Sequence, residues 1–392
     1  MNILFVSEDY YPKTSGVPVV VQYLAEGLAQ KGHKVSIATK SYATSPKEEL
    51  VNEVQIFRFN IYDDILKTPR GCTEEFIRFV LNQNADATII ECTQCITTDI
   101  LLPFVGKIGG KVYFHVHGIS GLTPNRKLFA VKSNLKHTIG NTYNYIRSLF
   151  YFQYKLKKAM PFFQATMCLS EVDDGIEYLK KYSRKNYVLG NAADNMFFDS
   201  HFYENEKLSK YTSLENEKYM MSCANYTVIK NQLDMIRQYY QSKASKNISL
   251  VCIGTQNNEY YYECQKLVAE LEDKYGHRDV KLLHGIKRKD IPAIINKATL
   301  YLVSSTWEKY SISIIEAMSQ GVPFISTNVG NARLLPGGMT INVIDEMHNA
   351  IDSLLENEHM YQIYSDAGRK FTYDNCRIKI AVDRLERILK EE

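Results

Sequence analysis

The chain has 392 residues, of which 45% are hydrophobic and 23% charged, and its formal net charge is +3. This length exceeds one ordinary hydrophobic core, so two domains are expected, and the composition excludes disordered and fibrous proteins. The N-terminus MNILFV lacks a basic segment before its apolar residues, and no run reaches 18 apolar residues. The sequence therefore predicts neither a signal peptide nor a membrane-spanning helix. The eight scattered cysteines are expected to be reduced, which favours a cytoplasmic location.

The first half alternates short apolar runs with segments of helical spacing. Residues 17–32 have helical periodicity, and strands are predicted at the runs 2–7, 33–39, 87–91, 111–117 and 165–170. Short apolar strands separated by helices indicate parallel strands covered on both faces, which is the pattern of a doubly wound sheet.

Charge is segregated within this half. Residues 100–170 contain ten Lys or Arg and no Asp or Glu, and aromatic residues are dense between 143 and 154. Within this segment, residues 125–163 suit the headgroup region of an anionic membrane, and we predict a peripheral membrane contact on the cytoplasmic face. A solvated basic face over buried aromatic helices is the alternative. Nucleic acid is not predicted, because no recognisable RNA-binding or single-strand-binding module surrounds these residues.

A turn-rich stretch near residue 190 precedes a second half of the same kind. Strands are predicted at 218–224, 248–254, 280–285, 298–305 and 322–327, with helices at 231–242 and 259–276 among them. The predicted architecture is two doubly wound, Rossmann-like α/β domains facing a cleft, with ligands at the carboxyl ends of the strands. The domains are placed at 1–190 and 191–372, and the final segment 373–392 forms a helix that could cross back to the first domain.

Two glutamates in the stretch WEKYSISIIEAMSQGVPF carry the main functional hypothesis. Glu308 is placed in the loop after a strand, and Glu316 inside the following helix. The amides of Tyr310, Ser311 and Ile312 would lie at that helix's N-terminus, which favours anions. Because carboxylates accept hydrogen bonds from vicinal hydroxyls, this set could bind two polyols across a diphosphate, as in a nucleotide sugar. The alternative is a solvated Glu308 and an ordinary surface acid at Glu316.

Several motifs in this order resemble glycosyltransferase family 4, a family of retaining GT-B glycosyltransferases also called glycosyl transferases group 1. The glutamate pair with AMSQGVPFISTNVG resembles the family signature, and SGVPVVVQYLAEGLAQKGHKVSIAT resembles its N-terminal glycine loop and helix. FHVHG, VLGNAADNMFF, ANYTVIKNQ and the segment from VKLLHG to LYLVSS resemble four further motifs. The likeness covers nearly the whole chain.

The resemblance implies a role for each matching residue. Glu316 would hold the ribose hydroxyls, Glu308 the transferred sugar, and Lys230 the departing phosphate. The amides of Tyr310, Ser311 and Ile312 would receive the pyrophosphate. His117 would point into the cleft at the donor sugar, with His115 as the competing candidate. Three more matches complete the implied donor site: Gly16 for close backbone approach, and His284 with Gly285 beside the base.

The resemblance also implies that no metal ion or cofactor is needed, and no ligand set with metal-binding spacing is recognised in the sequence. Two departures affect the phosphate site. Asn225 stands where the family often has Arg, and Lys309-Tyr310-Ser311 replaces the usual aromatic-Gly. Lys309 could compensate for the missing cation.

The function predicted from the sequence is sugar transfer from a nucleotide sugar with retention of anomeric configuration, and a UDP- or GDP-sugar is the expected donor. The acceptor would be a saccharide or a lipid-linked saccharide of a cell-surface polysaccharide or glycoconjugate. Two alternatives remain open: a nucleotide-sugar epimerase on the same scaffold, and a catalytically inactive binding subunit.

Overall fold

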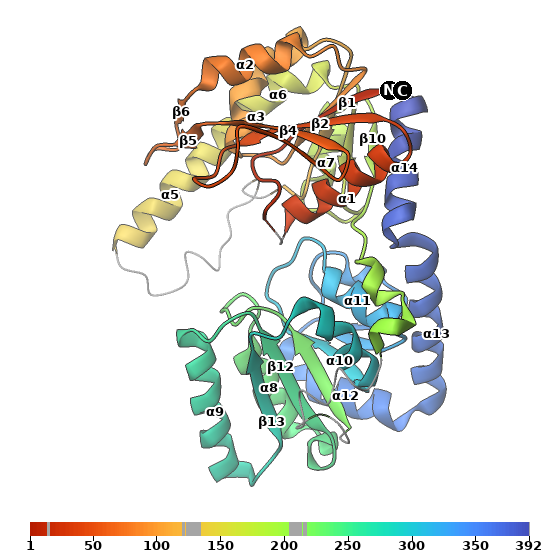
Figure 1. The fold of residues 1–392 in the computed structure, drawn as a ribbon. Helices are drawn as coiled ribbons and strands as arrows, with labels where there is room; N and C mark the ends of the chain where they lie inside the picture. Colours follow the sequence, from red (N-terminus) through yellow and green to blue (C-terminus); the bar gives the residue numbers. More distant parts are fainter. Residues whose placement is uncertain (14–15, 120–121, 123–134, 204–213, 215–217, 392) are drawn as a thin grey trace. The chain divides into compact units, whose positions relative to one another are not determined.

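A computed structural model describes residues 1–13, 16–119, 122, 135–203, 214 and 218–391. The chain forms two compact units (Figure 1). The first unit comprises Met1–Gly190 together with Ala381–Glu392, and the second comprises Asn191–Ile380.

The first unit is built on an eight-stranded sheet in the order β10-β9-β8-β7-β1-β2-β4-β3. All neighbouring strands pair in parallel except β3, which runs antiparallel to β4 at the edge. A separate antiparallel hairpin joins β5 to β6. The strands of the unit are β1 (Asn2–Val6), β2 (Lys34–Lys40), β3 (Glu48–Val51), β4 (Val54–Phe59), β5 (Ile61–Asp63), β6 (Pro69–Gly71), β7 (Ala87–Glu91), β8 (Lys111–His115), β9 (Ala165–Cys168) and β10 (Asn186–Val188).

Apolar periodicity places helices on both faces of this sheet (Figure 1). Leu4 and Val6 of β1 belong to a core shared with the helices that follow β6 and β7, whereas Ile3 and Phe5 are buried on the opposite face. The helices of the unit are α1 (Val17–Gln30), α2 (Thr73–Asn82), α3 (Ile96–Leu101), α5 (Leu135–Phe150), α6 (Lys157–Ala159) and α7 (Ile176–Tyr182), with short segments η1 (Leu102–Lys107), the π-helical η2 (Tyr151–Leu156) and η3 (Met160–Phe162).

The second unit has a six-stranded sheet in the order β13-β12-β11-β14-β15-β16, and every neighbouring pair is parallel. Its strands are β11 (Tyr219–Cys223), β12 (Ser249–Gly254), β13 (Val280–His284), β14 (Leu300–Val303), β15 (Phe324–Thr327) and β16 (Gly338–Ile341). Its helices are α8 (Gln232–Gln241), α9 (Glu259–Tyr275), α10 (Ile291–Lys297), α11 (Ile312–Ser319), α12 (Met347–Glu356) and α13 (Glu358–Asn375), with short segments η4 (Asn195–Phe197), η5 (Ser200–Tyr203), η8 (Lys243–Lys246), η9 (Arg288–Asp290), η10 (Ala332–Leu334) and η11 (Ile344–Glu346).

Strand order reverses once in each sheet, and ligands of open α/β sheets bind at such reversals, beyond the carboxyl ends of the strands. In the first unit the reversal separates β1 from β7, and in the second it separates β11 from β14. The predicted α/β fold with two doubly wound sheets is confirmed. The apolar runs did not predict β4, which lies inside the first sheet, or the short peripheral strands β3, β5, β6, β10 and β16.

The last helix, α14 (Ile378–Glu391), connects the two units. The sequence analysis began the final segment at residue 373, but that residue lies inside α13, and the first unit resumes at Ala381. The reason is that helix α13 continues to Asn375, so the second unit extends beyond residue 372. Beyond this point Val382 fills the space beside Gly27 of α1, and Lys31 forms ion pairs with Asp383 and Glu386.

Among the described residues, no helix is both long and apolar enough to cross a membrane.

The packing of α14 predicts a large effect of Leu385→Ala, because this side chain is fully buried. Loss of its contacts should lower the free energy of unfolding by roughly 2 to 5 kcal/mol, measured by urea denaturation. The exposed neighbour Arg387 is the matched control, and Arg387→Ala should change stability by less than about 0.5 kcal/mol. Equal effects of the two substitutions would contradict the docking of α14.

Candidate functional site

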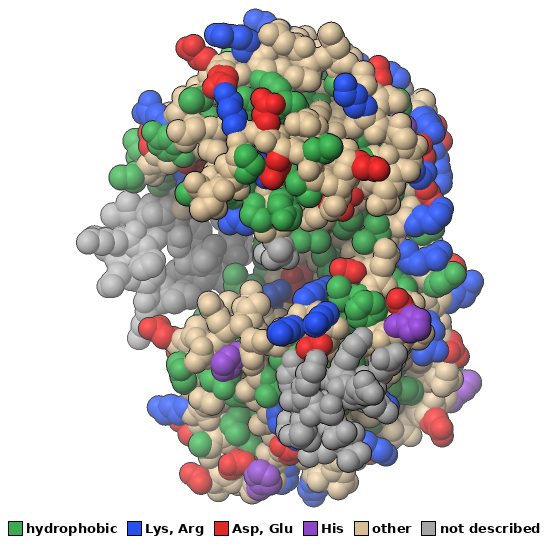
Figure 2. Space-filling model, in the orientation of Figure 1, with side chains coloured by type: hydrophobic (Ala, Val, Ile, Leu, Met, Phe, Trp, Pro, Cys, Tyr) green, Lys and Arg blue, Asp and Glu red, His purple; other side chains and the backbone are tan. Residues whose placement is uncertain are grey.

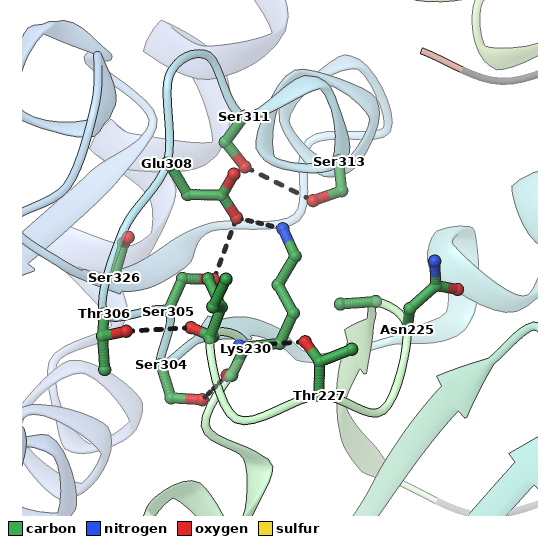
Figure 3. Close-up of polar contacts among 12 residues, drawn as sticks. Asn225, Thr227, Lys230, Ser304, Ser305, Thr306, Glu308, Ser311, Ser313 and Ser326 are labelled. Atoms are coloured by element: carbon green, nitrogen blue, oxygen red, sulfur yellow. Dashed lines mark hydrogen bonds and ion pairs between the residues drawn. The ribbon is translucent and has the colours of Figure 1, made fainter. Parts of the chain in front are cut away.

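The strand reversal of the second unit brings together two predicted residues of opposite charge. Lys230 lies in the loop after β11 and Glu308 in the loop after β14, and their side chains form an ion pair (Figure 3). Ser305 donates a second hydrogen bond, 2.9 Å long, to the same oxygen of Glu308. Both charged side chains remain partly exposed. The lysine predicted to hold a phosphate and the acid predicted to hold a sugar are therefore adjacent, and each neutralises the other when no ligand is bound.

Hydrogen bonds to backbone carbonyls fix the two loops that carry Lys230 and Glu308. The hydroxyl of Ser304 donates to the carbonyl of Lys230 at 2.8 Å, and the amide of Thr306 donates to the carbonyl of Ile229 at 2.8 Å. Thr327, at the end of β15, donates its hydroxyl to the carbonyl of Ser305 at 2.6 Å. Loops held in this way present side chains in one arrangement before a ligand arrives, which is a requirement for precise positioning.

Helix α11 begins at Ile312, four residues after Glu308. The prediction that Glu308 lies in a loop and Glu316 in the helix is confirmed. The amides of the first helical turn have no carbonyl partners within the helix, so this terminus can receive an anion. The amide of Ser311, however, already donates to Oδ1 of Asn331 at 3.1 Å. A pyrophosphate would thus meet the amide of Ile312 directly, whereas the amide of Ser311 would have to exchange partners.

Gly330 explains how the segment after β15 reaches this loop. Its φ is +52°, and a Cβ atom there would lie 2.9 Å from the carbonyl oxygen of Lys309 and 3.2 Å from that of Glu308. Any larger residue at position 330 would push the segment after β15 away from the loop that carries Glu308.

Glu316 is not an ordinary surface acid, because only 3% of its side chain is exposed. Both of its carboxylate oxygens accept hydrogen bonds from Arg288, and one of these bonds is 3.1 Å long. Burial raises the pKa of Glu316, and the guanidinium of Arg288 opposes this shift. The side chain of Arg288 is 51% exposed, and its guanidinium carbon lies 4.7 Å from the ring centre of Phe197. The ribose assignment therefore requires that a diol share this carboxylate with Arg288 or displace it.

The remaining predicted residues of the second unit lie around the carboxyl ends of its strands. Asn225 follows β11, and its Oδ1 accepts a hydrogen bond of 2.8 Å from Thr255. His284 ends β13 and packs edge-on against Tyr261 at 5.4 Å, and Gly285 has a φ of +69° with open space beside it. Lys309 lies 5.1 Å from the ring centre of the exposed Trp307, and Tyr310 packs against the core.

In the first unit, two predicted residues follow strands near the reversal, β1 and β8. Gly16 comes after β1 and precedes α1 with a φ of +70°, and nothing lies within 4 Å of its absent Cβ. His117 lies just beyond β8 and is buried, with Nε2 at 2.6 Å from Oε2 of Glu91. Nδ1 of His115 lies 3.0 Å from the same oxygen. That His117 faces a ligand stays a prediction; its side chain is 5% exposed.

Two imidazoles and a carboxylate could in principle hold a divalent metal ion, and the ligand atoms of Glu91, His115 and His117 lie within 4.8 Å of one another. Nε2 of His117 forms a hydrogen bond of 2.6 Å with Oε2 of Glu91, and Nδ1 of His115 lies 3.0 Å from the same oxygen, so the three side chains already contact one another directly. The sequence analysis did not recognise this cluster because Glu91 is distant from the histidines along the chain.

Sequence reasoning also missed Arg288 and Asn331. Arg288 lies in a run of three cations, and nothing local distinguishes it from its neighbours Lys287 and Lys289. The available signal was the position of this run directly after β13. The sequence analysis had placed the nucleotide base at the end of that strand.

The buried pair predicts a coupled effect on stability. Arg288→Ala leaves the carboxylate of Glu316 without its cation and should cost roughly 1 to 3 kcal/mol, less than a fully buried pair because Arg288 is half exposed. In the double variant Arg288→Ala with Glu316→Gln, much of that loss should be recovered, as measured by urea unfolding of all four proteins. The exposed neighbour Lys289 provides the control Lys289→Ala, which should be nearly neutral. Additive losses would show that the two groups do not interact.

Parts of the chain resemble known protein families and a known enzyme. Residues 204–371 match the family described as Glycosyl transferases group 1, and residues 2–94 match the Starch synthase catalytic domain. N-acetyl-alpha-D-glucosaminyl L-malate synthase of Bacillus anthracis is 23% identical over 206 residues, which are 49% of this chain and 51% of that protein. The chain thus aligns with about half the length of this relative.

Two solved structures share the fold over the whole chain. Sucrose-phosphate synthase of Thermosynechococcus elongatus has a TM-score of 0.72 at 14% identity, covering 100% of this chain and 98% of that one. HepE of Anabaena, solved with UDP and glucose, has a TM-score of 0.69 at 14% identity and covers 100% of both chains. The protein therefore has the GT-B fold, and the family match lies within its second unit.

Proposed function

We propose that this protein transfers a sugar from a nucleotide-sugar donor to a saccharide or lipid-linked saccharide. The observation that carries the proposal is the match of residues 204–371 to the glycosyl transferases group 1 family, because that segment contains Lys230, Arg288, Glu308 and Glu316. A similar structure supports the choice of donor: HepE of Anabaena was solved with UDP and glucose. A UDP-sugar is accordingly the first donor to test, with GDP-sugars next.

Each charged group has a part in this proposal. The carboxylate of Glu316 accepts the ribose hydroxyls, and Glu308 accepts hydroxyls of the transferred sugar. On donor binding Lys230 leaves Glu308 and pairs with the pyrophosphate, beside the amide of Ile312. This exchange replaces one ion pair with another, so the lysine's charge stays matched throughout.

The proposed chemistry retains the anomeric configuration and needs no metal ion. The bond from the anomeric carbon to the phosphate oxygen breaks, and the new bond from that carbon to the acceptor oxygen forms on the same face. The departing phosphate takes the proton of the acceptor hydroxyl. Because negative charge builds up on the phosphate in the transition state, a nearby cation lowers the barrier most.

A panel of nucleotide sugars tests the proposal. Transfer or slow hydrolysis of one donor, followed by release of the nucleoside diphosphate, supports a transferase. Conversion of the donor into its epimer would support the epimerase alternative. Binding without turnover would support an inactive binding subunit.

Lys230→Ala should lower kcat by roughly 100- to 1000-fold, because one charged donor to the developing phosphate charge is lost. The KM for the donor should change much less. Lys243→Ala is the matched control, since Lys243 is an exposed lysine paired only loosely with Glu356 at 3.5 Å. A near-normal kcat in Lys230→Ala would assign the leaving-group role to another cation, with Lys309 the next candidate.

The acceptor part of the proposal rests on one surface of the first unit, which we call the apolar stripe. Helix α5 and η2 expose Tyr143, Ile146, Phe150 and Tyr154 at intervals of three or four residues, which places them along one face. The hairpin β5–β6 continues this surface: Ile65 is 98% exposed, and the hydroxyl of Tyr143 donates to the carbonyl of Leu66 at 3.3 Å. Figure 2 shows hydrophobic side chains on the surface over β5 and β6.

Cations accompany the apolar stripe. The ammonium of Lys158 lies 4.0 Å from the ring centre of Tyr154, and Lys155 and Lys157 are exposed nearby. Three cations of the acid-free segment, Arg126, Lys127 and Lys132, lie outside the described residues, as does the side chain of Lys136. Aromatic and aliphatic side chains beside cations suit the interface of an anionic membrane, where a lipid-linked acceptor would reside.

Membrane contact predicts binding to acidic vesicles that weakens as salt rises. Each cation near such a surface contributes roughly 1 kcal/mol, within a Debye length of about 8 Å at physiological salt. Changing Lys155, Lys157 and Lys158 to Gln should therefore reduce co-sedimentation with acidic vesicles by at least tenfold, and donor hydrolysis should be unaffected.

The control carries the same charge change on the second unit, with Lys243, Lys266 and Lys370 changed to Gln, and it should bind vesicles as wild type does. If the wild-type protein ignores acidic vesicles at low salt, the acceptor is better sought among water-soluble saccharides.

A further inference from the structure

The carboxylate of Glu91 is the most deeply buried charged group beside the strand reversal of the first unit. Its side chain is 0% exposed, and it ends β7 directly opposite His115 of β8. His115 and His117 are 1% and 5% exposed, and their ring centres lie 4.0 Å apart. The acid and the two imidazoles form a small polar cluster at the end of two buried strands, and no other charged side chain of the described residues forms a hydrogen bond with the acid.

The two histidines favour the ionised form of Glu91. Burial alone would raise the pKa of Glu91, but His115 and His117 outweigh it and lower the pKa to about 2. One oxygen, Oε2, contacts both imidazoles, whereas Oε1 has no hydrogen-bond partner among the described residues. A buried carboxylate is costly, and a hydrophobic residue of similar size would often be at least as stable, so stability alone does not explain an acid here.

The geometry instead fixes the hydrogen-bonding state of His117. A carboxylate can only accept a hydrogen bond, so the contact of 2.6 Å requires that Nε2 of His117 carry a hydrogen. In the neutral ring the hydrogen then resides on Nε2, and Nδ1 has a free lone pair. Burial lowers the pKa of His117, with His115 adding to the effect, which favours this neutral form.

Position distinguishes the two histidines. His115 lies within β8, and its backbone carbonyl accepts from the amide of Cys92 at 2.9 Å. His117 lies beyond the end of β8, next to Gly118, whose φ is +91°. His117 is therefore the member of the cluster at the strand end, where ligands of such sheets bind.

We propose that Glu91 is a positioning residue that holds His117 in the Nε2–H tautomer, so that Nδ1 accepts a hydrogen bond from a hydroxyl of the transferred sugar. The second half of this proposal, the hydrogen bond to the sugar, rests on the proposed function. The first half, the tautomer of His117, does not. Glu91 acts only through His117 and touches no substrate, and His115 holds the carboxylate in place from the other side.

Histidine nitrogen NMR on the whole protein tests the first half without any turnover. The wild-type spectrum should show His117 as the Nε2–H tautomer, with its Nε2 proton shifted far downfield by the short bond to the carboxylate. His117→Asn should abolish that signal and so assign it, and Glu91→Gln should move it upfield. A Nδ1–H tautomer in the wild type overturns the proposal, and so does a stoichiometric zinc content, since the three side chains would then be metal ligands.

Kinetics tests the second half. Glu91→Gln should lower kcat for sugar transfer by roughly 10- to 100-fold and leave the affinity for the nucleoside diphosphate unchanged, because the groups proposed to hold the nucleotide do not include Glu91 or His117. In a His117→Asn background, Glu91→Gln should have no additional effect on kcat, whereas independent roles would give multiplied losses. Glu171→Gln, at an exposed acid of the same unit, is the control and should retain wild-type activity.

The two arms separate the possible failures. If the tautomer is found but no nucleotide sugar is used, the proposed function fails and the Glu91–His117 contact stands. If a donor is used but Glu91→Gln retains wild-type kcat, or its effect multiplies with that of His117→Asn, the positioning role is overturned. Should Glu91→Gln not fold, the wild-type tautomer and the kinetics of His117→Asn still decide between these outcomes.

Discussion

The parallel pairing of strands on both sides of each reversal is the constraint on which the rest of the structure depends. Parallel strands end at the same edge of a sheet, so residues that follow different strands must gather there. Met220 of β11 pairs with Leu300 of β14, which places the loops carrying Lys230 and Glu308 side by side although 78 residues separate them. In the first unit the same rule places Glu91, at the end of β7, opposite His115 of β8.

Charge matching is the second common feature of these strand ends. In the second unit Glu308 is paired with Lys230, and Glu316 with Arg288. A half-buried charge without a partner is costly, and each of these acids lies beside a cation of the same unit. A nucleotide sugar brings hydroxyls for the acids and phosphates for the cations, and it can replace these internal partners group by group. The ion pairs thus mark the places where the proposed donor would bind.

Local patterns were enough to predict the main strands, the two doubly wound sheets and the placement of Glu308 in a loop and Glu316 in a helix. These features depend on apolar periodicity and on turns within a few residues. Arg288 and Glu91 could not be found in that way, because their importance arises from partners 28 and 26 positions along the chain. The end of the second unit was placed too early for a similar reason, since no turn signal reveals that α13 continues to Asn375.

The chain contains one direct probe of nucleotide-sugar binding at the strand ends of the second unit. Trp307 is the only tryptophan, it is exposed, and it precedes Glu308. Titration with UDP, GDP and their sugars, followed by Trp307 fluorescence, should give a saturable change for one nucleotide series, and Glu316→Ala should weaken that binding by at least tenfold. Saturable binding that is equally tight in Glu316→Ala, or no response to any nucleotide when calorimetry also detects no binding, would contradict the account.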